Sequence, residues 1–165
     1  MGFHSAALSL KIRQCIEIIE AIEKQIDEIV SMIKKHPLVD KSPLFKIKGI
    51  NAIEIGYIMS AIISIDQFDS PGKLVALAGL DPKVRQSGTW KASVTRMSKK
   101  GNKLLRYALI WTSNNMIRYE SKMKAYYEKK RSESKSHYNA LGHCAAKLCR
   151  YIFFILNNPE AEFVN

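Results

Sequence analysis

A serine followed by glycine lies within the most basic stretch of this sequence. The segment Arg85-Gln86-Ser87-Gly88 places a hydroxyl two residues after a guanidinium and beside a residue without a side chain. A serine hydroxyl is a poor nucleophile unless a base removes its proton or nearby cations stabilise the alkoxide. With such help Ser87 could attack a phosphodiester and form a phosphoserine ester, which conserves the bond energy for rejoining. A Ser-Gly pair in a loop is more often a simple turn, so spacing alone leaves both interpretations open.

The residues around Ser87 carry positive charge without compensating negative charge. Residues 83–106 contain eight Lys and Arg side chains and no Asp or Glu, in a chain of net charge +11. A solvated protein surface normally mixes both signs, so this segment favours a polyanion as its partner. The predicted phosphate contacts are Lys83, Arg85, Arg96, Lys99, Lys100, Lys103 and Arg106.

A second candidate contact with nucleic acid consists of Lys48, Gly49 and Asn51. Gly49 follows a brief helical turn, and Asn51 is placed to cap a new helix with Glu54 as its capping-box partner. This pattern is typical of a helix-hairpin-helix, in which free N–H groups at a helix N-terminus meet a phosphate. A plain helical corner with glycine at the C-cap fits the same residues about equally well.

The apolar periodicity predicts an all-α fold with strand content close to nil. Residues 83–98 have no helical period and predict a mobile or briefly extended loop. Trp111 and Tyr138 fall on apolar helix faces, so both are expected in the core. The predicted helices cover approximately residues 12–36, 51–66, 70–79, 102–116, 122–131 and 136–157.

Isoleucines recur from Ile12 to Ile33 at steps of three and four residues, which is the seam of a coiled coil. The helix should end near His36-Pro37, because proline cannot continue it. Such a seam must be buried on a partner helix or on the body of the same chain, and self-association is favoured. The predicted organisation is therefore an oligomerisation helix at 1–38 and a helical domain at 39–165, with its basic loop at 83–101.

Several classes of protein are disfavoured. No apolar run approaches the roughly 18 residues that a membrane span needs, and the N-terminus does not resemble a signal peptide. The three cysteines (Cys15, Cys144, Cys149) and four histidines have no metal-ligand spacing, so no metal site is expected on this chain. Buried thiols in a reducing cytoplasm are the simplest expectation.

Three blocks in a fixed order resemble the C-terminal transposase domain of the bridge-RNA-guided insertion-sequence transposases. The resemblance covers about residues 44–156, with the coiled coil preceding it. The blocks are Ala76-Leu77-Ala78-Gly79-Leu80-Asp81-Pro82, Gln86-Ser87-Gly88 and Ser98-Lys99-Lys100-Gly101-Asn102-Lys103-Leu104-Leu105-Arg106.

The resemblance implies that Ser87 is the nucleophile that becomes linked to DNA. It also implies an oligomer acting on DNA with a structured guide RNA, in the cytoplasm of a bacterium or archaeon at the nucleoid. In that family an N-terminal RuvC-like domain holds Mg²⁺ through carboxylates, which residues 83–106 could not supply. Because this sequence lacks that domain, the chain alone is expected to bind nucleic acid and dimerise without completing strand transfer.

Two other functions remain open at this point. The chain could be a non-catalytic helix-hairpin-helix module that only binds nucleic acid. It could also be a helical dimerisation protein whose charge serves solubility alone. A steep fall of nucleic-acid affinity with salt would argue against the last of these, because phosphate contacts release counterions.

Overall fold

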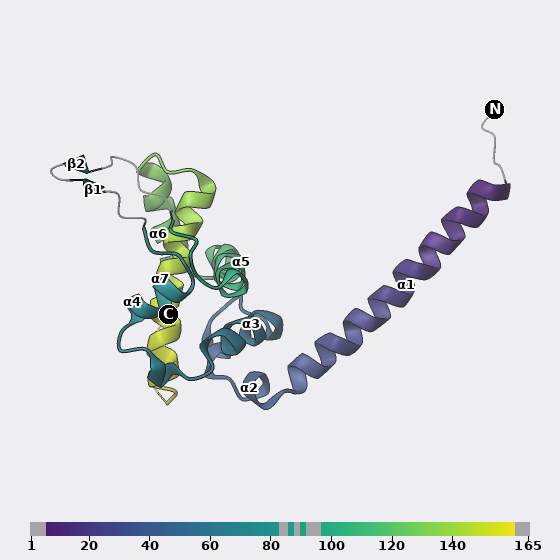
Figure 1. Cartoon of the computed structure of the whole chain (residues 1–165), viewed down its shortest axis with the longest axis horizontal. Coiled ribbons are helices and arrows are strands. Elements are labelled where there is room, and N and C mark those ends of the chain that lie inside the picture. Colours follow the sequence, from purple (N-terminus) through teal and green to yellow (C-terminus); the bar gives the residue numbers. More distant parts are fainter. Residues whose placement is uncertain (1–5, 83–85, 88–89, 92–96, 161–165) are drawn as a thin grey trace.

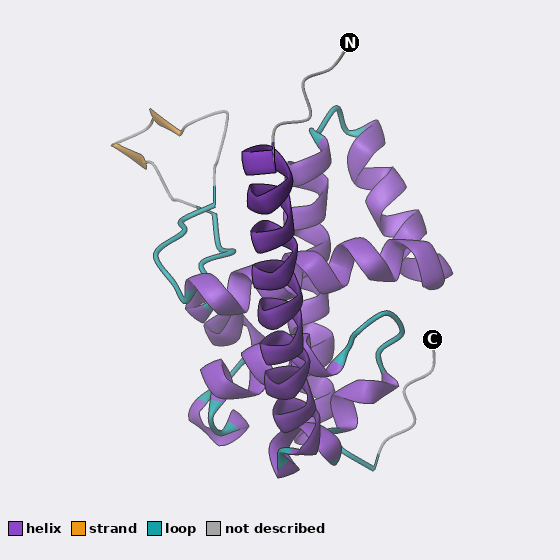
Figure 2. Ribbon diagram, turned by 90° about the vertical axis from the view of Figure 1, so that its right-hand side faces the viewer, coloured by secondary structure: helices purple, strands orange, loops and turns teal. Residues whose placement is uncertain are grey.

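The computed structural model describes residues 6–82, 86–87, 90–91 and 97–160. A long helix, α1, extends away from a body formed by the remaining helices (Figure 1). The prediction of an all-α fold is confirmed. Figure 2 shows that helices make up nearly all of the regular structure, with two short strands set apart at one edge.

The elements follow one another with short connections. The long helices are α1 (Ala6–Lys35), α3 (Ala52–Ile62), α5 (Lys103–Tyr119), α6 (Ser121–Ser132) and α7 (His137–Asn157). The shorter elements are α2 (Pro37–Asp40), η1 (Pro43–Lys46), η2 (Ile65–Gln67), α4 (Pro71–Leu77), β1 (Gln86–Ser87) and β2 (Trp90–Lys91).

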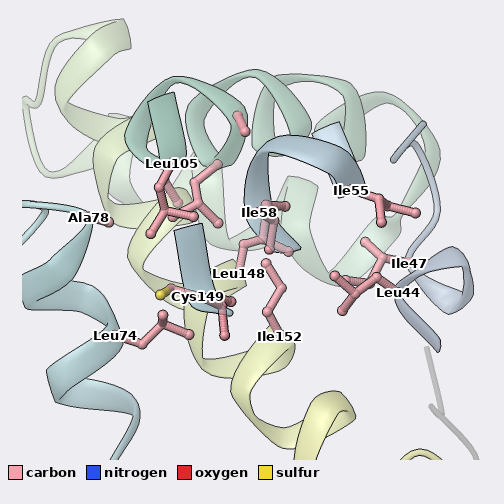
Figure 3. Packing of buried hydrophobic residues seen from close by; sticks show 14 of the residues in the cluster. Leu44, Ile47, Ile55, Ile58, Leu74, Ala78, Leu105, Leu148, Cys149 and Ile152 are labelled. Atoms are coloured by element: carbon pink, nitrogen blue, oxygen red, sulfur yellow. The ribbon is translucent and has the colours of Figure 1, made fainter. Parts of the chain in front are cut away.

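The core of the body forms around α7, against which α4, α5 and α6 pack. Its apolar stripe includes Leu148, Cys149 and Ile152, which are fully buried. Figure 3 shows these side chains meeting residues of the other elements, including Ile58 of α3 and Leu105 of α5. The stripe is part of one continuous apolar cluster that also includes residues of α4 and α5. This shared core fixes α5 relative to α4.

Most helix starts are determined by capping residues that the sequence shows directly. Asn51 and Glu54 form the predicted capping box at α3, and the Asn102 side chain caps α5. The Ser136 hydroxyl accepts a hydrogen bond from the Asn139 amide at the start of α7. The end of α3 was predicted less well: the helix stops at Ile62, and Ile63 lies outside the core at 75% exposure with φ 57°.

Helix α1 is confirmed as a helix that ends just before His36-Pro37. None of its residues is buried, and its isoleucines from Ile12 to Ile29 are about half exposed. Only its C-terminal end contacts the body, where Ile33 lies against Gly56 so closely that an added Cβ would come within 3.2 Å of Ile33 Cγ2. The isoleucine seam is therefore not covered by the described part of its own chain.

No helix within the described ranges has the length and apolar character needed to cross a membrane.

Candidate nucleic-acid interface

The two segments that flank the basic loop are tied together at its base. We call residues 77–82 and 97–102 the clasp. Across it the Asn102 amide donates to the Leu77 carbonyl at 2.6 Å, and the Lys99 amide donates to the Gly79 carbonyl at 3.1 Å. A further bridge pairs Pro82 with Met97. The clasp therefore brings the first and third sequence blocks together and brackets the loop that contains the second.

A serine and an aspartate of the clasp reinforce this backbone pairing. The Ser98 hydroxyl donates to Asp81 Oδ1 at 2.6 Å, and the Ser98 amide donates to the Asp81 carbonyl at 2.8 Å. Ser98 is buried. The Asp81 carboxylate, which immediately precedes the basic loop in the sequence, is thus engaged in holding the base of that loop closed.

Two glycines allow the halves of the clasp to approach each other. A Cβ on Gly101 would lie 2.0 Å from the Leu77 carbonyl oxygen, and one on Gly79 would lie 2.7 Å from the Gly101 amide nitrogen. Gly79 also has φ 64°, which favours glycine. Any side chain at Gly101 would separate the segments, so the spacing of these glycines has a direct steric cause.

Ser87 lies in a short antiparallel pair beyond the clasp. Strands β1 and β2 pair with Ser87 opposite Trp90 and Gln86 opposite Lys91. Figure 1 shows both strands standing away from the helical body. The predicted contacts Lys83, Arg85 and Arg96 lie outside the described residues, so their assignment stays a prediction.

Three of the predicted phosphate contacts gather where the clasp meets α5. Lys99, Lys100 and Lys103 are all exposed. Within the described residues the ion pairs involve only Glu133, with Lys130 and Lys135. The three lysines are therefore not neutralised by a described carboxylate, and they lie at the helix end where the dipole also favours an anion.

Arg106 has a structural contact that the sequence did not indicate. Its Nη1 donates to the Ala78 carbonyl at 2.9 Å, and the side chain is half-buried. This bond ties α5 to the C-terminal end of α4 and so supports the clasp. A phosphate contact by the rest of the guanidinium remains a prediction.

The residues of the proposed hairpin form a closed helical corner. The Asn51 side chain accepts from the Ile53 and Glu54 amides, while Glu54 Oε2 accepts from the Asn51 amide at 2.9 Å. Gly49 has φ 85° and packs on the backbone of α5 at Asn115 and Met116. These bonds occupy N–H groups that a phosphate would need, which favours the simpler corner. The nucleic-acid contacts assigned to Lys48, Gly49 and Asn51 stay predictions.

The cysteines divide into two groups. Cys144 and Cys149 are buried in α7, and burial raises the pKa of their thiols to about 11 and about 12, respectively. The expectation of a buried thiol is wrong for Cys15, which is exposed on α1. Among the residues with described positions, no three His, Cys, Asp or Glu side chains come together to hold a metal ion.

Sequence reasoning misplaced two aromatic residues and missed the surface that one of them forms. Trp111 was expected in the core but is 48% exposed, and Tyr138 is 76% exposed. Trp111 stacks on exposed Tyr107, which meets Tyr57 of α3 edge to face. The spacing of Tyr107 and Trp111 by one helical turn was the available signal. It was hidden because α5 carries apolar residues on more than one face.

The comparison with known families now decides the class of protein. The sequence profile described as "Transposase IS116/IS110/IS902 family" matches residues 41–128. The chain belongs to this transposase family. No curated protein matches it.

The matched part of the transposase contains the features just described. Residues 41–128 include the helical corner at Gly49, the clasp, both strands and all of α5. The match begins after α1 and ends within α6. The family match therefore covers both the basic loop and the clasp at its base.

Proposed function

We propose that this transposase domain binds DNA through its basic loop and uses Ser87 as the nucleophile in strand cleavage and rejoining. The supporting observation is the clasp, which joins the family's two flanking blocks at the base of the segment that contains Ser87. An arrangement that closes both ends of a loop reduces the conformational entropy lost when the loop orders on a substrate. Strand β1, which contains Ser87, stands away from the helical body (Figure 1).

The charge distribution supports a phosphate substrate. Lys99, Lys100 and Lys103 extend the clasp with exposed cations, and the segment from 83 to 106 contains no acid. Cations placed where negative charge develops stabilise the transition state of phosphoryl transfer. They also favour the alkoxide form of a nearby hydroxyl.

The proposed chemistry balances without an external energy source. Ser87 Oγ forms a bond to phosphorus while the bond from phosphorus to one sugar oxygen breaks. The proton lost by Ser87 ends on the released sugar hydroxyl. Attack of another strand's hydroxyl on the phosphoserine ester reverses these steps, joins the new strand and regenerates Ser87.

The remaining components of the reaction are assigned to partners. The described residues do not fit a Mg²⁺ site, since they contain no cluster of ligands. We therefore assign any Mg²⁺ to a RuvC-like domain that these 165 residues do not include. A guide RNA and a homo-oligomer formed through α1 complete the proposal, at the nucleoid in the cytoplasm.

Replacing the serine in a protein that also contains the RuvC-like domain tests the proposal. Ser87→Ala should abolish a covalent DNA adduct that survives denaturation, measured with end-labelled DNA on a denaturing gel. Ser93→Ala is the matched control, because it removes another hydroxyl from the same basic segment, and it should retain the adduct. DNA affinity should remain in both variants.

Two results would overturn this assignment. An adduct that persists in Ser87→Ala would show that another residue is the nucleophile. DNA binding with neither an adduct nor strand transfer in the unsubstituted protein would indicate a non-catalytic nucleic-acid-binding module. A helix-hairpin-helix role for Lys48, Gly49 and Asn51 belongs to that alternative.

A further inference from the structure

An exposed group of aromatic side chains on α3 and α5 has no role in the proposed chemistry. We call Tyr57, Tyr107 and Trp111 the aromatic surface. The rings of Tyr107 and Trp111 are 6.2 Å apart between centroids and inclined by only 16°, while Tyr57 meets Tyr107 at 6.3 Å and 88°. Tyr107 and Trp111 are 55% and 48% exposed. Two nearly parallel rings therefore present much of their area to solvent.

The aromatic surface is bordered by cations and lacks exposed carboxylates along both helices. Lys103 and Arg118 are exposed on α5 on either side of the two rings, and no Asp or Glu occurs between residues 82 and 119. On α3 the only acid is Glu54, which is buried in the capping box. An anionic partner would therefore meet no exposed, repelling carboxylate along α3 and α5.

Two amides extend the same face of α5 with hydrogen-bonding capacity. Asn114 and Asn115 follow Trp111 by three and four residues, so they lie one turn further along the helix. Both are half-buried, and their side chains form no hydrogen bond within the described part of the chain. An amide offers both donors and an acceptor, which suits the edges of bases.

We infer that the aromatic surface binds unpaired nucleotides of a single-stranded nucleic-acid segment. Aromatic side chains stack on bases of any sequence, and cations beside them contact the backbone. In a duplex the base faces are already stacked, so only unpaired bases could use these rings. This inference rests on the proposed function in taking nucleic acid as the partner, but it does not involve Ser87.

The position of Lys103 connects this surface with the proposed DNA contacts. Lys103 belongs to the lysine group at the clasp and begins the helix that carries both rings. From Lys103 to Arg118, α5 extends about 22 Å. A strand leaving the lysines at the clasp could follow α5 across Tyr107 and Trp111. This continuity, together with the lack of exposed acids, favours nucleic acid over a second protein surface as the occupant.

The test uses the 165-residue chain with fluorescein-labelled oligonucleotides. Affinities for 12-nucleotide oligothymidine, for oligouridine and for a 12-base-pair DNA duplex are measured by anisotropy at fixed salt. Tyr107→Ala/Trp111→Ala should weaken binding to one or both single strands by about 5- to 150-fold per stacked base lost. Binding to the duplex should change by less than about twofold. Trp111→Phe should retain most of the single-strand affinity.

A matched control and a spectroscopic readout accompany these titrations. Tyr138→Ala removes an exposed aromatic ring from α7 and should leave all three affinities unchanged. In a Trp90→Phe background Trp111 is the only tryptophan, so unlabelled oligothymidine or oligouridine should quench its fluorescence. Circular dichroism and thermal melting verify that each variant is folded.

Distinct outcomes would overturn the inference. Unchanged single-strand affinity in the double variant would contradict it, as would equal losses for single strands and duplex. If the double variant instead loses self-association in sedimentation while retaining oligonucleotide binding, the surface is a protein interface. The titrations measure strand binding and not the covalent adduct at Ser87, so loss of the adduct and loss of strand binding are separate results.

Discussion

Helices α1 and α7 carry the same kind of apolar stripe but differ in what covers it. In α7, nine residues are buried, and the stripe lies against α4, α5 and α6. In α1, which is nine residues longer, none is buried, and its main contacts with other elements are those with α2 and α3. Periodicity thus identifies the face that favours burial, whereas it does not identify the partner.

The stripe of α1 is more regular than its isoleucines alone suggest. If Cys15 takes the place of Ile16, the spacing alternates strictly between four and three residues. This alternation covers Leu8, Ile12, Cys15, Ile19, Ile22, Ile26, Ile29 and Ile33. A strict heptad of this kind is typical of helices that pair with other helices. We therefore retain self-association through α1 as a proposal.

The largest expected effect comes from matched truncations in the two stripes. Ile152→Ala in α7 should lower the free energy of unfolding by about 2–5 kcal/mol, because it leaves a cavity at a fully buried site. Ile19→Ala in α1 should change it by less than about 0.5 kcal/mol in dilute protein, because that side chain is already about half exposed. Urea denaturation followed by circular dichroism measures both.

The contrast between these variants is the critical result. Equal losses in dilute protein would mean that the α1 stripe is buried within the monomer, and the distinction between the two helices would fail. A loss for Ile19→Ala that appears only at high protein concentration would instead support pairing between chains, because association then contributes to stability.

Thiol labelling distinguishes the two helices with a smaller effect. At pH 8 the thiols of Cys144 and Cys149 should react at least about 100-fold more slowly than Cys15, because burial raises their pKa values and limits access. If α1 pairs along its heptad, raising the protein concentration should slow labelling of Cys15. Mass spectrometry of peptides after timed alkylation measures each site.

Ile22→Asp provides the control for that labelling. A charge in the seam should prevent pairing and remove the concentration dependence at Cys15, while Cys144 and Cys149 remain protected. Labelling of Cys15 that is independent of concentration in the unsubstituted chain would count against self-association through α1.

The sequence predicted local features well because neighbouring residues determine them. Asn51 caps α3 as predicted, and Asn102 and Ser136 cap helices whose starts were expected at about these residues, since a cap needs only the following turn. The clasp could not be predicted in this way. Its glycines matter because Gly79 and Gly101 meet across a long loop, and no local pattern shows that contact.

The misplaced aromatic residues have a related cause. In α5 the buried face includes Leu105, Leu109 and Met116, while Leu104 and Trp111 form a second apolar face that is exposed. Because α5 has apolar residues on two faces, the periodicity of its sequence does not determine which face is directed toward the core. For the candidate site, Ser87 and the lysines are predictions made from the sequence, whereas the aromatic surface and the hydrogen bond of Arg106 to Ala78 required the structure.

The smallest expected effect concerns His143, at the edge of the buried stripe of α7. It is half-buried in a cleft that also includes Glu133 and Lys135. Burial lowers the pKa of His143, the charges of Lys130 and Lys135 lower it further, and Glu133 partly opposes them. The unfolded chain therefore binds a proton at this residue at a higher pH than the folded chain does.

The sign of the pH dependence follows from this order of proton binding. Above the ordinary histidine pKa of about 6.5 both states are neutral at this residue and stability is unaffected. As the pH falls through 6.5 toward the lower folded value, the unfolded state gains protons first and stability decreases. His143→Gln should make the decrease between pH 7 and 5 shallower, measured by thermal melting. High salt should reduce this contribution of His143 only in part, because salt screens the charges of the lysines but does not change the burial of the ring. If stability falls as steeply in His143→Gln as in the unsubstituted chain, the pH dependence originates from another residue.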